Sequence, residues 1–97
     1  MSRNALQLAK TDNVATAMED IAKGDDVAIA DTDGLEEDHI TARDDIPRGH
    51  KMALRTIHIG DEVVKYGYAI GIVTREIQRG VHVHTDNLSS ARGRGDL

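Results

Sequence analysis

The chain has 97 residues, which suits one domain with a single modest core, so we expect one domain over residues 1–97. Its formal net charge of −5 argues against nucleic-acid binding, which requires a basic surface. The lack of cysteine excludes disulfides, thiolate metal sites and a cysteine nucleophile. No apolar run approaches the roughly 20 residues of a membrane span, and there is no apolar leader segment, so we expect a cytoplasmic protein.

The apolar composition indicates which kind of element carries the core. The chain contains nine isoleucines and seven valines but no phenylalanine or tryptophan, so the core must be aliphatic. Because β-branched residues are enriched in strands, the composition predicts a mostly β fold.

The first third of the chain predicts a strand, a helix and a second strand. Residues 5–9 alternate apolar and polar side chains and predict an edge strand. Thr11 and Asp12 resemble a helix N-cap, and apolar residues then follow at helix-like spacing. We therefore expect one short helix over about residues 12–20. Residues 27–30 predict a short strand.

The remaining segments divide into an acidic loop, a turn-rich region and a tail. Residues 31–38 are acidic and contain Gly34, which predicts an exposed loop. From His39 onward, short apolar runs alternate with glycine-containing turns, without a helical period. We expect the core to span about residues 5–88, with a flexible tail over 89–97.

One four-residue pattern, Ile-x-x-Gly, occurs four times, and we call its copies the corner turns. The corner turns are residues 21–24, 46–49, 57–60 and 77–80. In each copy we expect the isoleucine to end a strand and point inward, and the glycine to supply a positive φ. Pro47 is the second residue of its copy, where a type I turn favours a fixed φ. Unequal spacing between the copies argues against a solenoid and favours a compact sheet fold with similar corners.

Two histidine-bearing segments follow corner turns and carry the unusual chemistry of the chain. In a strand, His82, His84 and Asp86 would share one face. Imidazoles and a carboxylate on one face can hold a divalent cation, with His84 and Asp86 as candidate ligands, or bind an anionic or polyol ligand by hydrogen bonds. His50 and Lys51 can add a cationic pole for a carboxylate or sulfonate.

Hydrolysis by this chain alone is not predicted, and the two other histidines are expected at the surface. The sequence has no Gly-x-Ser-x-Gly elbow and no glycine-rich phosphate loop before a helix. His39 falls in the predicted acidic loop and His58 in a corner turn.

Three ordered segments, residues 45–54, 65–71 and 80–88, resemble the SAF domain of the altronate/galactarate dehydratase family. The resemblance covers about residues 5–88. In that family the domain is either the N-terminal part of a sugar-acid dehydratase or a separate small subunit, as in the alpha subunit of sulfolactate sulfo-lyase. Because the chain ends near the end of the domain, we expect the separate small subunit.

The resemblance also implies a fold, a partner, a cofactor and site residues. It implies a β-clip fold and a larger partner chain, able to form an oligomer, that carries most of a lyase site and a divalent metal, expected to be iron. The implied substrate is a small acid, either a sugar acid such as altronate or galactarate, or sulfolactate. The family motifs imply catalytic roles for His84 and His50, and substrate-binding roles for Lys51, Asp86, Asn87 and His82.

Asp86 departs from the family pattern, which usually has histidine at that position. An anion there can still bind metal, but it disfavours direct contact with a carboxylate or sulfonate. The main alternative function is a non-catalytic SAF module that binds a carbohydrate or another ligand. A third is an isolated metal-binding protein.

Overall fold

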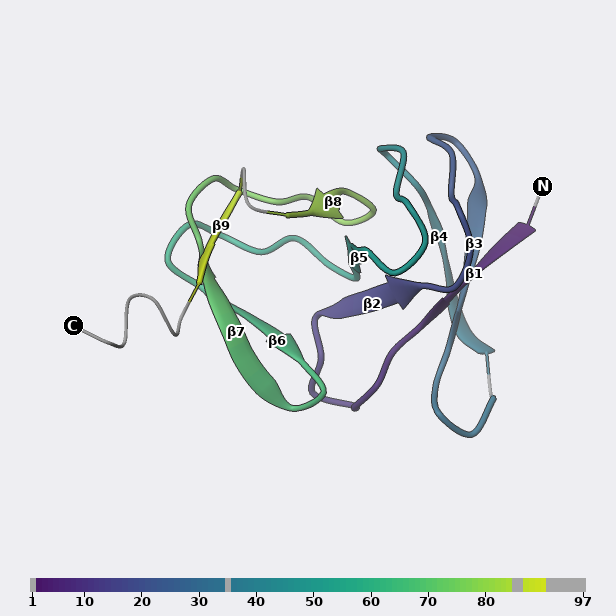
Figure 1. The fold of residues 1–97 in the computed structure, drawn as a ribbon, viewed down its shortest axis with the longest axis horizontal. Helices are drawn as coiled ribbons and strands as arrows, with labels where there is room; N and C mark the ends of the chain where they lie inside the picture. The colour runs from purple at the N-terminus through teal and green to yellow at the C-terminus, as the bar shows by residue number, and fades with distance from the viewer. Residues whose placement is uncertain (1, 35, 85–86, 91–97) are drawn as a thin grey trace.

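The computed structural model describes residues 2–34, 36–84 and 87–90, and these residues form two β-sheets (Figure 1). One sheet has six strands in the order β4-β3-β1-β2-β5-β8, and the other has three in the order β6-β7-β9. The strands are β1 Ser2–Leu6, β2 Val14–Ala17, β3 Asp26–Ala30, β4 Glu36–Thr41, β5 Lys51–Ala53, β6 Glu62–Lys65, β7 Tyr68–Val73, β8 His82–Val83 and β9 Leu88–Ser90. The prediction of a mostly β fold is confirmed.

The first strand lies inside the larger sheet, so the predicted edge strand is wrong in position. β1 pairs in parallel with β3 and antiparallel with β2. Ala5 is 1% exposed and belongs to the buried apolar cluster that also contains Ala17 and Ile29. The alternation of this segment reports only that one face is more polar. It does not report how many neighbouring strands flank it.

The predicted helix over residues 12–20 is wrong, because its centre is strand β2. Val14, Ala15 and Ala17 are all buried, and β2 pairs antiparallel with both β1 and β5. Two strand partners supply more stabilisation than one short helix could, so tertiary pairing overrides the local spacing. The structure contains no helix among residues 2–34, 36–84 and 87–90, and therefore none that could span a membrane.

Asp12 is part of a hairpin brace and is not the helix N-cap that its position suggested. Its buried carboxylate accepts hydrogen bonds from the backbone N–H groups of Ala9, Tyr66 and Gly67 at 3.0, 2.7 and 2.9 Å. Tyr66 and Gly67 both have positive φ, 54° and 78°, which defines a two-residue type I′ turn between β6 and β7. Asp12 thus holds in place a turn that is unfavourable for tyrosine.

The four corner turns form with inward isoleucines and positive-φ glycines as predicted, but the isoleucines do not end strands, since they lie in isolated bridges outside them. Their isoleucines are at most 3% exposed, and their glycines have φ between 85° and 95°. The apolar residue three positions after each glycine is also buried, and these residues are Val27, Met52, Val63 and Val83. Burying each of these side chains contributes about 2 kcal/mol, so the corners account for much of the core.

The corner turns associate in two pairs through their isoleucines. Ile21 forms an antiparallel bridge with Ile46, and Ile57 forms one with Ile77. In the first pair, each turn receives a carboxylate from the other. Asp45 accepts from the backbone N–H of Lys23, and the carboxylate of Asp20 accepts from Arg48 in the same way, both at 2.9 Å. The acidic residue before these isoleucines is therefore explained by turn stabilisation.

Pro47 has a different place in its turn from the predicted one. The N–H of His50 donates to the carbonyl of Pro47 at 2.9 Å, so Pro47 is the first residue of the hydrogen-bonded turn. Gly49 is then the third residue, and its φ of 85° identifies a type II turn instead of type I.

Two predicted loop boundaries also shift. The acidic loop is shorter than residues 31–38, because β4 begins at Glu36 and pairs with β3. His39 consequently lies on β4 and not in a loop, although it is exposed as expected. At the other end, Leu88–Ser90 is strand β9 and pairs with β7, so the tail cannot begin at residue 89. Residues 91–97 lie outside the described residues.

The structure predicts that glycine-to-alanine changes at two corner turns have unequal costs. A Cβ at Gly60 meets no atom within 4 Å, so Gly60→Ala should lose only the backbone preference, about 1–2 kcal/mol. A Cβ at Gly80 would lie 2.5 Å from the carbonyl oxygen of Thr41, so Gly80→Ala should lose about 1–3 kcal/mol more. Urea denaturation of both variants measures this difference. Equal losses would contradict the close approach at Gly80.

Candidate functional site

The corner turn at residues 46–49 places His50 directly before β5. His50 is exposed, and its carbonyl accepts from the N–H of Ala17 at 2.8 Å. The turn therefore fixes the backbone of His50 against the end of β2 and leaves the imidazole at the surface.

The corner turn at residues 77–80 places His82 on β8, beside β5. His82 pairs with Met52, and its N–H donates to the carboxylate of Asp44 at 3.0 Å. Its carbonyl accepts from the side-chain amide of Asn87 at 2.9 Å. The backbone of His82 is thus held from three sides.

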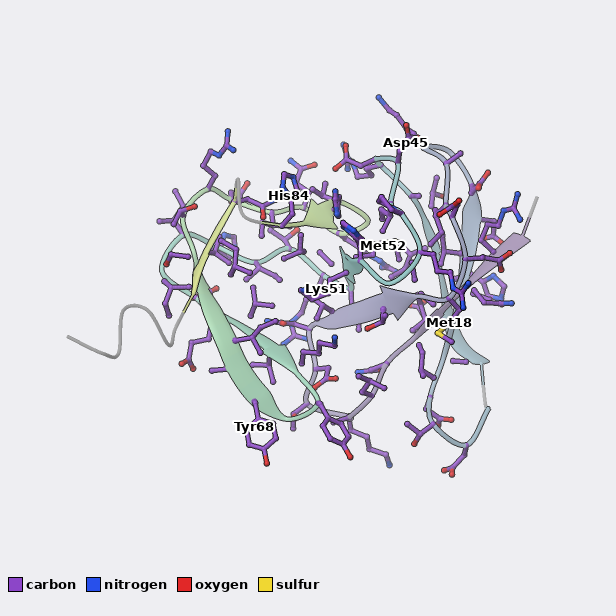
Figure 2. All side chains as sticks on the ribbon, viewed as in Figure 1. Met18, Asp45, Lys51, Met52, Tyr68 and His84 are labelled. Atoms are coloured by element: carbon purple, nitrogen blue, oxygen red, sulfur yellow. The ribbon has the colours of Figure 1, made fainter. Side chains whose placement is uncertain are left out.

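His84 follows β8 (Figure 2). The same asparagine, Asn87, holds its backbone. The N–H of His84 donates to the side-chain oxygen of Asn87 at 3.0 Å, and the N–H of Asn87 donates to the carbonyl of His84 at 3.1 Å. Both ends of the Asn87 amide therefore bind the backbone of its own loop. The expected substrate-binding role of this residue stays a prediction, and its observed role is to shape the loop.

The three imidazoles of His50, His82 and His84 lie together, and we call them the histidine cluster. Nδ1 of His50 and Nε2 of His82 are 2.9 Å apart, so one nitrogen donates the proton and the other accepts it. The ring centroids of His50 and His82 are 5.0 Å apart, and those of His82 and His84 are 4.4 Å apart. The sequence placed His82 and His84 on one face, and the short distance between their rings agrees with this.

The environment lowers the pKa of His82 below its ordinary value. Partial burial is the largest cause, followed by the charges of His84 and His50, while Asp44 acts in the opposite direction. Near neutral pH the cluster therefore favours a neutral His82. A neutral imidazole can accept a proton or a hydrogen bond through its unprotonated nitrogen.

Lys51 does not extend the histidine cluster as its sequence position suggested. Lys51 pairs with Val83, whereas Met52 pairs with His82. Successive residues of a strand point to opposite faces, so the side chains of Lys51 and His82 leave the sheet on opposite sides. Lys51 is still near enough for its charge to add to the lowering of the pKa of His82.

The remaining predicted site residue, Asp86, lies outside the described residues, together with Thr85. Among residues 2–34, 36–84 and 87–90, no three histidine, aspartate or glutamate side chains are arranged to hold a metal ion. The hydrogen bond between His50 and His82 also occupies one nitrogen of each ring. The residues described here therefore do not fit a metal site by themselves.

Sequence reasoning missed Asp44 and Lys65 and placed His58 correctly. Asp44 binds the backbone of His82, but in the sequence it is only one of two adjacent aspartates before a corner turn. Lys65 lies near Lys51, since its charge acts on the Lys51 ammonium. His58 is exposed in its corner turn, with Nδ1 3.0 Å from the carboxylate of Glu76.

The histidine cluster lies on an open part of the surface. His50 is exposed, and His82 and His84 are half-buried. Three hollows in the described surface are lined by other residues, around Lys10 and Asp31, around Ile21 and Pro47, and around His39 and Arg79. A site on the cluster would therefore need a second surface to exclude water.

Comparison with known proteins relates the chain to one enzyme family. The model of the "Altronate/galactarate dehydratase SAF domain" matches residues 3–91. The chain is 40% identical over 82 residues to altronate dehydratase of Escherichia coli, covering 84% of this chain and 15% of that enzyme. It is 45% identical over 53 residues to (2R)-sulfolactate sulfo-lyase subunit alpha of Paracoccus pantotrophus, covering 55% of this chain and 79% of that subunit. It thus spans about a sixth of the length of the altronate dehydratases that it matches.

The lowered pKa of His82 predicts a pH dependence of stability. Because the folded state holds His82 with a lower pKa than the unfolded state, the unfolded state binds the proton more tightly. Stability should therefore fall as pH decreases from the ordinary histidine pKa, about 6.5, through the folded pKa of His82. His82→Gln should reduce the loss of unfolding free energy between pH 7.5 and pH 5.5.

The matched control is His39→Gln, which removes an exposed histidine on β4. This variant should keep the wild-type acid sensitivity, because a change at the exposed His39 leaves His82 and its surroundings unaltered. Urea titrations at both pH values give the comparison. An unchanged acid sensitivity in His82→Gln would show that protonating His82 costs nothing.

Proposed function

Because the chain belongs to the altronate/galactarate dehydratase SAF domain family, we propose that it is the small subunit of a lyase acting on a sugar acid or sulfolactate. The reaction removes a proton next to a carboxylate and breaks a carbon–oxygen or carbon–sulfur bond, releasing water or sulfite. The family match over residues 3–91 is the observation that carries this proposal. The SAF assignment also supports the β-clip fold that the sequence resemblance implied.

The larger chain that completes the site is part of the proposal. The relatives that match most of this chain are several times longer than the part they share with it, and another relative is named as a subunit. The open position of the histidine cluster fits a site that closes only when another surface covers it. We assign a divalent metal, expected to be iron, to the larger chain, since the described residues here do not fit one.

The histidine cluster is the contribution of this chain to the site. His84 and His50 are assigned the roles closest to the substrate, with His82 between them. A neutral His82 has one donor and one acceptor nitrogen. It can therefore hydrogen-bond His50 through one nitrogen and a group on the substrate side through the other, without adding a charge. Covering the cluster would exclude water and strengthen every polar contact with the acid, which orients the substrate for elimination.

The proposal is tested by turnover in the reconstituted complex of this chain with the larger chain. Elimination is measured with altronate, galactarate and (2R)-sulfolactate as separate substrates. His84→Ala and His50→Ala should each lower kcat/KM by about 100-fold or more, as expected for groups that take part in proton transfer or orientation. The isolated chain should show no turnover.

His58→Ala is the matched control, because His58 is exposed on a different corner turn and bonds Glu76. It should retain wild-type turnover. Wild-type turnover in His84→Ala would contradict the assignment of His84 to the site. A complex that assembles but turns over none of the three acids would contradict the proposed substrate class and would favour a ligand-binding module.

A further inference from the structure

The backbone groups of His82 are satisfied by side chains and not by a neighbouring strand. Among the described residues β8 is the last strand of its sheet, so only β5 pairs with it. The carbonyl of Val81 accepts from the N–H of Ala53 at 3.0 Å, which turns the backbone groups of the next residue, His82, away from β5. On that outer side the N–H of His82 donates to Asp44, and its carbonyl accepts from Asn87. These two side chains therefore place the central ring of the histidine cluster.

The residues on either side of Asp44 fix its position between two corner turns. The N–H of Arg43 donates to the carbonyl of Gly80 at 2.8 Å, which ties it to the turn at residues 77–80. The carboxylate of Asp45 accepts from the N–H of Lys23 at 2.9 Å, in the turn at residues 21–24. Asp44 is half-buried between these two contacts. Its carboxylate can therefore act as a fixed support for the outer edge of β8.

Asp44 also differs in charge from the other groups around the ring of His82. Three charged neighbours lower the pKa of this ring, namely His84, His50 and Lys51. Asp44 is the one described residue whose charge raises it. A neutral amide or hydroxyl oxygen could accept the same backbone N–H, so the hydrogen bond alone does not account for a carboxylate here. A negative charge beside the imidazoles favours their protonated form.

We propose that Asp44 is a positioning residue of the histidine cluster, which holds His82 next to His50 and supplies the negative charge that lets the cluster carry a proton. Asp44 acts through His82 and is assigned no contact with the substrate. It lies outside the segments 45–54, 65–71 and 80–88, which carry the family resemblance.

The purpose of this proton rests on the proposed lyase function. When the carbon–oxygen or carbon–sulfur bond breaks, its electron pair leaves with the departing hydroxide or sulfite. A protonated imidazole of the cluster can give its proton to that group and become neutral, so that hydroxide leaves as water. The charge of Asp44 offsets the neighbours that would otherwise keep the ring of His82 unprotonated.

Two substitutions separate the position of the ring from the charge beside it. Asp44→Asn keeps an oxygen that can accept from the N–H of His82 but removes the negative charge. Asp44→Ala removes both. Each variant is studied as the intact isolated chain by nuclear magnetic resonance, with the histidine rings labelled with ¹⁵N. The nitrogen–nitrogen coupling between the rings of His50 and His82 reports their position, and the pH titration of His82 reports the charge.

The two variants of Asp44 should give different results. In Asp44→Asn the coupling should persist, and the midpoint of the His82 titration should move to lower pH, because the one charge that raises its pKa is lost. In Asp44→Ala the coupling should also weaken or disappear, since the N–H of His82 loses its acceptor at 3.0 Å. An unchanged titration in Asp44→Asn or an unchanged coupling in Asp44→Ala would each overturn the proposal.

Asp45→Asn is the matched control, because it makes the same change at the next residue. The carboxylate of Asp45 also accepts a backbone N–H, but from Lys23. Asp45 is not among the groups whose charge acts on the pKa of His82. This variant should keep both the coupling and the titration of the wild type. An equal shift in Asp45→Asn and Asp44→Asn would assign the effect to a general loss of acidic charge and would overturn the proposal.

Turnover of the complex with the larger chain tests what the charge is for. Asp44→Asn should lower kcat by about tenfold at neutral pH and change KM little, as expected for a group that acts on proton transfer. The loss should shrink as the pH is lowered, because the ring of His82 regains its proton. Wild-type kcat at every pH would overturn the role of Asp44 and leave the lyase function standing. A wild-type complex without activity would count against the lyase function, whereas the isolated chain would still decide whether Asp44 sets the cluster.

Discussion

Each corner turn reverses the chain within four residues only because its glycine takes a φ near 90°, which a side chain would resist. The reversal buries the isoleucine before the turn and the apolar residue three positions after the glycine. Bridges between isoleucines then join the turns in pairs, Ile21 with Ile46 and Ile57 with Ile77. One turn from each pair is followed within two residues by a histidine, and the pairing of β5 with β8 brings those two histidines together. The geometry of the histidine cluster therefore depends on the turns.

The features that follow from local chemistry were predictable from the sequence, and those that depend on distant partners were not. Ile-x-x-Gly encodes a buried residue and a positive φ within four positions, so the corner turns were confirmed. Residues 14–17 carry apolar residues compatible with helix or strand, and only their pairing with β1 and β5 decides for a strand. The spacing of His82 and His84 predicted their shared face. The contact of His50 with His82 joins residues 32 positions apart and has no local signal.

The two faces of the β5–β8 pair carry different polar groups. The histidine cluster occupies one face, with a neutral His82 favoured by partial burial. Lys51 leaves the opposite face, where burial and the charge of Lys65 lower the pKa of its ammonium group. Asn87 and Asp44 hold the histidine loop through its backbone, which leaves the rings available.

The most direct test of the account is the hydrogen bond between the rings of His50 and His82. With all histidine nitrogens labelled with ¹⁵N, a nitrogen–nitrogen coupling across the bond should appear between Nδ1 of His50 and Nε2 of His82 near neutral pH. One of these nitrogens should be protonated and the other not, as their 2.9 Å separation requires. If instead there is no coupling and both rings titrate as independent imidazoles, the corner turns do not bring the two histidines together, and the histidine cluster does not exist.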